Sequence, residues 1–108
     1  MEKVPETDSE YMAFVDALYD EFPSMLRWHN SATGQDEFAC FGADPAWLPS
    51  IRKMLADLQF LYSINSLELP VFSDFKAKRG RLSIHWDGGC PLADEVIDAL
   101  EDVINAAN

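Results

Sequence analysis

The chain has 108 residues, close to the commonest size of a single domain, and 48% of them are apolar, which argues against an intrinsically disordered protein. Nineteen acidic residues against eight basic ones give a formal net charge of −11, which disfavours direct binding to nucleic acid or anionic lipid and favours a partner with a basic surface. The first residues are too polar for a signal peptide and no apolar run approaches the ~20 residues of a membrane span, so we expect a cytoplasmic protein.

The first predicted element is a helix that begins after a capping box. Thr7 is followed three residues later by Glu10, the pattern in which a hydroxyl and a carboxylate satisfy the first turn. Apolar side chains then recur at the 3.6-residue spacing of a one-faced helix as far as Phe22, and Pro23 ends the helix. Residues 1–6, which precede this helix, are expected to be frayed.

A β-hairpin is predicted next, because the apolar period changes after the first helix. Residues 25–29 and 37–41 read as its two strands, and the turn formers of residues 30–34 lie between them.

A second helix is predicted to start after Asp44, whose side chain can cap it, with Pro45 in a first-turn position. Pro49 complicates this start, so the helix proper is expected near Pro49, with an entry turn before it. Apolar residues then repeat at helical spacing to Tyr62, and the helix ends near Asn65.

The second hairpin is predicted over residues 71–76 and 81–86, with a turn at residues 78–80. In its second strand, Leu82, Ile84 and Trp86 alternate with the more polar side chains, as in a strand with one buried face. A last helix follows the glycines near residue 88, and its buried stripe is predicted to consist of Leu92, Val96, Ile97, Leu100, Val103 and Ile104.

These elements predict one α+β domain over residues 1–108. Hairpins favour an antiparallel sheet, and three helices with one apolar face each must cover it. We therefore expect about four strands, in two hairpins, covered by three helices in the order αββαββα.

Residues 47–51 open the second helix with Trp-Leu-Pro-Ser-Ile, and residues 75–86 form a basic strand pair ahead of an acidic helix. Together these segments resemble a group of small uncharacterised bacterial and phage proteins. That group has a Gly-Trp-x-Pro-type helix start and a Lys-Glu-Lys-Phe-Gly-x-Leu-Arg-like strand pair. The resemblance implies a fold and a mobile-element origin but no activity. The chain departs from the pattern at Ala46, Ala77, Arg79 and Ser83.

The sequence contains no catalytic motif, and we predict neither an enzyme nor a cofactor. The catalytic alternative is a Cys90–His85 pair across the turn that begins at Asp87, because a helix start favours a thiolate. A surface histidine and a helix-capping thiol explain the same residues without catalysis. The two cysteines and two histidines lack zinc-finger spacing, so no metal site is expected.

Half of the eight basic residues surround the turn of the second hairpin. They form an alternative site, for nucleic acid, or simply a solvated hairpin tip that protects a sheet edge: Lys76, Lys78, Arg79 and Arg81.

The last helix has the opposite character, because no Lys or Arg occurs after Arg81. Its carboxylates either serve solubility alone or attract a basic partner. We predict a small protein-interaction module, an inhibitor or immunity-type binder that docks on a basic surface such as a nucleic-acid-binding site. An anti-CRISPR or other phage counter-defence protein is one specific version. The predicted partner-binding residues are Asp94, Glu95, Asp98, Glu101 and Asp102.

Overall fold

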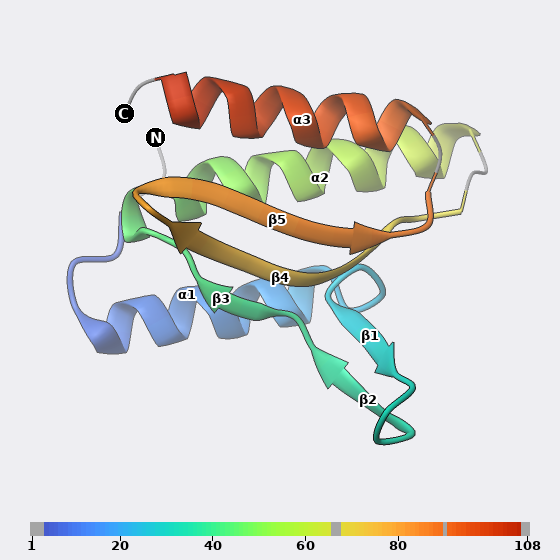
Figure 1. The fold of residues 1–108 in the computed structure, drawn as a ribbon, viewed down its shortest axis with the longest axis horizontal. Coiled ribbons are helices and arrows are strands. Elements are labelled where there is room, and N and C mark those ends of the chain that lie inside the picture. The colour runs from blue at the N-terminus through green and yellow to red at the C-terminus, as the bar shows by residue number, and fades with distance from the viewer. Residues whose placement is uncertain (1–3, 66–67, 90, 107–108) are drawn as a thin grey trace.

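The fold of this protein, taken from a computed structural model, is described for residues 4–65, 68–89 and 91–106 (Figure 1). It is α+β, as predicted, and in chain order its elements are α1 (Asp8–Glu21), β1 (Arg27–Asn30), β2 (Gln35–Phe38), β3 (Cys40–Gly42), the 3-10 turn η1 (Pro45–Trp47), α2 (Leu48–Asn65), β4 (Val71–Lys78), β5 (Arg81–Asp87) and α3 (Pro91–Ala106). Within the described ranges, every helix is too short or too polar to cross a lipid bilayer.

The strands form two sheets, which corrects the expectation of one antiparallel sheet of about four strands. β1 and β2 make a separate antiparallel hairpin, and β3, β4 and β5 form a three-stranded sheet with β4 at its centre. The element order is therefore αβββαββα. β3 runs parallel to β4, whereas β4 and β5 form the antiparallel hairpin that the sequence predicts.

The difference arises because the strand predicted over residues 37–41 divides at Ala39. This alanine is fully buried, and its N–H donates to the carbonyl of Leu26 at 2.8 Å, which continues the pairing of the first hairpin by one position. The chain then leaves β1 and pairs with β4, so that Phe41 lies opposite Phe75 and their rings stack with centroids 4.7 Å apart. Burying Phe41 against the central strand thus recruits the second half of the segment into the other sheet.

The helix starts agree with the sequence. The Glu10 N–H donates to Thr7 Oγ1 at 3.1 Å, so Thr7 caps α1. Asp44 Oδ1 accepts from the Ala46 N–H at 2.9 Å and caps η1, the expected entry turn, and Pro49 lies in the first turn of α2.

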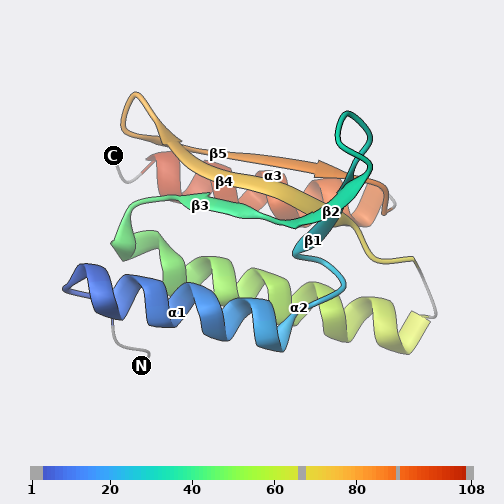
Figure 2. The same cartoon turned by 90° about the horizontal axis from the view of Figure 1, so that it is seen from below.

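The core lies between the three-stranded sheet and two of the helices. Figures 1 and 2 show α1 and α2 in one layer against the same face of the sheet, whereas no described helix covers the opposite face. The apolar stripe of α2 supplies much of the core, and all of these side chains are buried: Leu48, Ile51, Met54, Leu55, Leu58 and Tyr62.

Two tyrosines of α1 close one edge of the sheet, the edge formed by β3. The Tyr19 hydroxyl donates to the Ala39 carbonyl at 2.6 Å, and the Tyr11 hydroxyl donates to the Ala43 carbonyl at 2.9 Å. These carbonyls flank β3, so the hydroxyls satisfy acceptors that the edge strand would otherwise expose. Burial raises the pKa of both tyrosines, because the ionised form is poorly solvated there.

Replacing Tyr19 by Phe is expected to lower the free energy of unfolding by about 1 kcal/mol, since the Ala39 carbonyl loses its donor. The ring, which stacks on Phe38, is kept in this variant. Urea denaturation measures the change, and Met12→Leu, at a side chain that is 63% exposed, is the control. Equal stability of Tyr19→Phe and the wild type would show that this hydroxyl does not close the edge.

Candidate interaction surfaces

Helix α3 lies along the free edge of β5, and its side chains bind the backbone of that strand. The Ile84 N–H donates to the Glu101 carboxylate at 3.0 Å, and the Leu82 N–H donates to Asn105 Oδ1 at 2.9 Å. The Asn105 amide also donates to the Leu82 carbonyl at 3.4 Å. Helix α3 therefore replaces the neighbouring strand that β5 lacks, and it closes the second edge of the sheet.

The carboxylates predicted to bind a partner divide into two groups. Glu101 is half-buried against β5, and Asp94 Oδ1 accepts from the Trp86 indole N–H at 3.0 Å. These two carboxylates hold α3 to the sheet. The other three, Glu95, Asp98 and Asp102, are exposed and take part in no hydrogen bond or ion pair among the described residues.

These three carboxylates, Glu95, Asp98 and Asp102, are called the acidic face below. Their spacing of three and four residues places them on one side of α3. Val103 lies on the flank of the acidic face and is 70% exposed, which corrects its predicted place in the buried stripe. The reason is that Ala93, Ile97 and Ile104 make the buried contacts, so the helix is turned away from Val103.

The half-buried Glu101 has a perturbed titration. Burial raises the pKa of its carboxyl above the ordinary 4.5, the Ile84 N–H lowers it, and the nearby charges of Asp98 and Asp102 raise it further. The hydrogen bond from the Ile84 N–H thus compensates part of the cost of a negative charge at this half-buried position.

The basic residues predicted as the alternative site lie at the β4–β5 turn and in β4. Lys76 Nζ lies 3.5 Å from Asp74 Oδ2, so its charge is partly neutralised within the strand. The other three, Lys78, Arg79 and Arg81, are exposed and have no ion pair among the described residues. These three residues are called the basic turn below.

Of the alternative catalytic pair, only His85 lies within the part of the chain that the structure describes. His85 lies on the uncovered face of the sheet, with Nδ1 3.6 Å from Asp74 Oδ2, and Asp87 ends β5. Cys90 lies outside the described residues. The exposed Cys40 is opposite Asp74 in the register, but no group of three metal-binding side chains occurs within residues 4–65, 68–89 and 91–106.

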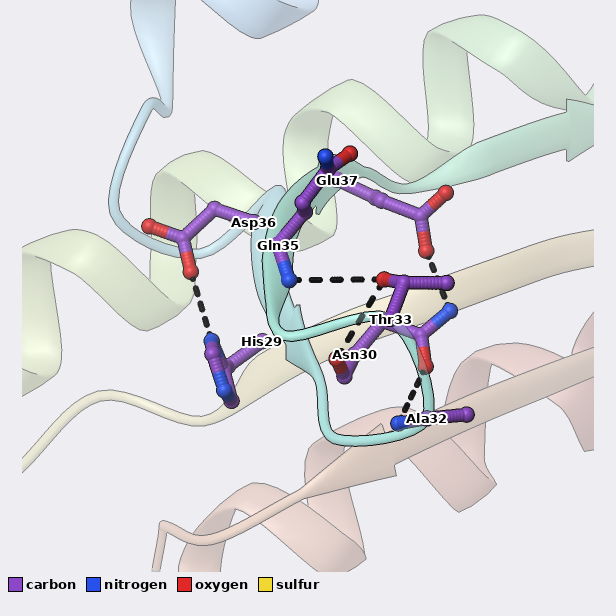
Figure 3. A network of polar contacts seen from close by, with 7 residues as sticks. All are labelled: His29, Asn30, Ala32, Thr33, Gln35, Asp36 and Glu37. Atoms are coloured by element: carbon purple, nitrogen blue, oxygen red, sulfur yellow. Dashed lines mark hydrogen bonds and ion pairs between the residues drawn. The ribbon is translucent and has the colours of Figure 1, made fainter.

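The β1–β2 hairpin carries a polar network that the sequence analysis did not anticipate (Figure 3). His29 Nδ1 lies 2.9 Å from Asp36 Oδ1, and the Asn30 amide donates to the Glu37 carboxylate. Asn30 Oδ1 also accepts from the Ala32 N–H at 3.0 Å and so shapes the turn. Because these carboxylates are occupied by neighbours, they differ from those of the acidic face.

Replacing Glu101 by Gln is expected to keep the protein at least as stable at pH 7, because the amide oxygen still accepts from Ile84 without a buried charge. Replacing it by Ala leaves the Ile84 N–H without its acceptor and is expected to cost about 1 kcal/mol. Urea unfolding of both variants and of the wild type checks this result.

The pH dependence gives a second readout of the same variants. A raised pKa means that the folded chain prefers the protonated Glu101. The resulting contribution of Glu101 to the free energy of unfolding is fully present below pH 4.5 and is lost as the pH rises through the raised pKa. The stability of Glu101→Gln relative to the wild type should therefore increase across that window. A difference that does not change with pH would contradict the assignment.

Comparisons of the chain with protein-family models, with curated proteins and with solved structures found no match. What these surfaces bind is therefore inferred from the described residues alone. The resemblance to small phage and bacterial proteins stays a prediction.

Proposed function

We propose that this chain is a protein-binding module, not an enzyme, and that it docks the acidic face of α3 on a basic surface of a partner protein. The observation that carries this proposal is the exposure of three unpaired carboxylates, Glu95, Asp98 and Asp102, on a helix whose other side is anchored to the sheet. An inhibitor or immunity-type protein is the class that this arrangement fits best.

Local stability gives no reason for these charges. Asp98 and Asp102 are four residues apart, where like charges repel each other, and α3 has no basic residue in its last turn. Asp102 also lies near the negative end of the helix dipole, which costs a few tenths of a kcal/mol. Residues that weaken their own helix are better explained by an interaction with another molecule.

The flank of the acidic face offers apolar contact as well. The exposed Val103 lies on the side of α3 that also carries Val96 and Leu100. Val96 and Leu100 line a shallow hollow of about 210 Å³ between α2 and α3, together with Met54. Protein interfaces combine a small apolar centre with charged residues around it, and this part of the surface has both.

Anchoring of α3 also favours binding. The bonds from Ile84 to Glu101 and from Trp86 to Asp94 hold the helix in place before any partner arrives. A surface that is already ordered loses less conformational entropy on association.

The chemistry of the acidic face also indicates which kind of partner it binds. A row of carboxylates competes with phosphates for the same Lys and Arg side chains, so a nucleic-acid-binding surface is the basic surface that we expect it to occupy. A phage protein that blocks a bacterial defence complex, such as an anti-CRISPR, would work in this way. The mobile-element origin that the resemblance implies is the reason for naming that version.

The triple substitution Glu95→Gln, Asp98→Asn and Asp102→Asn is expected to weaken binding to the native partner by tenfold or more, roughly 1.4 kcal/mol, at low salt. The partner is captured from the native host with the wild-type chain, and its affinity is then measured by titration over a salt series. The wild-type affinity should fall as the salt concentration rises.

The matched control removes three exposed carboxylates elsewhere, through Asp16→Asn, Asp20→Asn and Glu68→Gln. It has the same net charge as the triple variant of α3 but keeps the acidic face. Equal loss of affinity in both variants would assign the effect to net charge alone, and salt-independent binding would reject the electrostatic proposal.

Val103→Ser is expected to weaken the same complex by several-fold without lowering the stability of the free protein, because this side chain is 70% exposed. Affinity and urea unfolding are measured in parallel. A stability loss that accounts for the weaker binding, or unchanged binding, would remove Val103 from the interface.

A further inference from the structure

The basic turn is unusual for so acidic a chain. Its three cations, Lys78, Arg79 and Arg81, have no ion pair among the described residues, although acidic residues outnumber basic ones by 19 to 8. Two cations of α2 are paired, by contrast: Arg52 lies 2.7 Å from Glu21, and Lys53 lies 3.1 Å from Asp57. The fold thus exposes the cations of the turn to solvent, and none of them has an ionic partner in residues 4–65, 68–89 and 91–106.

The backbone conformation of the turn is a second unusual feature. Arg79 has φ +55° and Gly80 has φ +77°, so both central residues of this two-residue turn adopt the left-handed conformation. Such turns favour Asn, Asp or Gly at the first position, because a Cβ atom there is too close to the following carbonyl oxygen, and only glycine lacks one while Asn and Asp compensate by local hydrogen bonds. A guanidinium is held at this position despite that conformational cost.

A hollow of about 420 Å³ adjoins the turn, within the size range of small-ligand sites. It combines two guanidinium groups with an aromatic side chain that is 9% exposed and with one carboxylate, and it is lined by Asp44, Trp47, Ala77, Arg79, Gly80 and Arg81. Asp44 already accepts from the Ala46 N–H, so its charge is partly engaged.

We propose that this hollow binds a compact organic phosphate. The forked guanidinium groups of Arg79 and Arg81 match phosphate oxygens in pairs, and Lys78 adds a third positive charge for a dianion. Trp47 supplies an apolar wall for the organic part, and Asp44 can accept from its hydroxyl or amino group.

The charge of the whole molecule selects a compact anion over a nucleic acid. At physiological salt, charges act over about 8 Å, so a small phosphate at the turn responds mainly to the three nearby cations. A polyanion extends beyond the turn and meets the rest of a surface with net charge −11. Binding of a short ligand is therefore favoured over binding of an oligonucleotide.

The experiment titrates the full chain with adenosine monophosphate, inorganic phosphate and a single-stranded oligonucleotide, and it follows the backbone amide and tryptophan indole signals by NMR. We expect adenosine monophosphate to shift the signals of residues 77–81 and of Trp47, and to bind more tightly than the oligonucleotide. Tighter binding of the oligonucleotide would overturn the small-ligand assignment. The absence of shifts up to about 10 mM adenosine monophosphate would also overturn it, because a dissociation constant above that concentration is too weak for a binding site.

Two variants separate binding from folding. Arg79→Gly removes the guanidinium but suits the left-handed backbone, so affinity should fall about tenfold while the melting temperature is kept or raised. Lys53→Gln, which removes a paired charge on α2, should leave affinity unchanged. Unchanged affinity in Arg79→Gly would overturn the proposal. The triple variant of the acidic face should still bind, so this test is independent of the proposed protein partner.

Discussion

A three-stranded sheet has two edge strands, and the unpaired N–H and C=O groups of those edges are the constraint around which this fold is arranged. Side chains of two different helices satisfy them. Tyrosines 11 and 19 of α1 donate to the carbonyls that flank β3, and Glu101 and Asn105 of α3 bind the backbone of β5. The sheet is thereby closed on both sides by residues that belong to no strand, and the positions of α1 and α3 follow from these contacts.

Closing the β5 edge divides the acidic helix into two sides with different roles. Glu101 and Asp94 face the sheet, where a hydrogen bond offsets part of the cost of placing a half-buried charge at Glu101. The acidic face is left over on the outside, held at a fixed orientation by the same contacts. The position of α3 thus has two consequences: the helix is held to the sheet, and its acidic face is exposed to solvent. The proposed interaction surface depends on the sheet edge even though it does not touch it.

Charged side chains of this molecule form two clusters of opposite sign. Three exposed carboxylates without a partner among the described residues lie together on α3, three such cations lie together at the β4–β5 turn, and carboxylates of the β1–β2 hairpin are paired with His29 and Asn30. These two clusters support two proposals of opposite sign, a basic protein partner at the acidic face and a compact phosphate at the basic turn, which can be tested separately.

Local chemistry in the sequence was enough to predict the helices, their caps at Thr7 and Asp44, the β4–β5 hairpin and its turn, because each of these depends on neighbours within a few residues. The tertiary structure decided four other features: the division of one expected strand at Ala39, the parallel pairing of β3 with β4, the exposure of Val103 and the partial burial of Glu101, all of which depend on residues far away in the chain. Periodicity places a carboxylate on a helix face, but only the packing of that helix against β5 decides whether the carboxylate meets a backbone N–H or water. The sequence therefore determined the elements and the total charge, and the tertiary structure decided which charges remain free to bind another molecule.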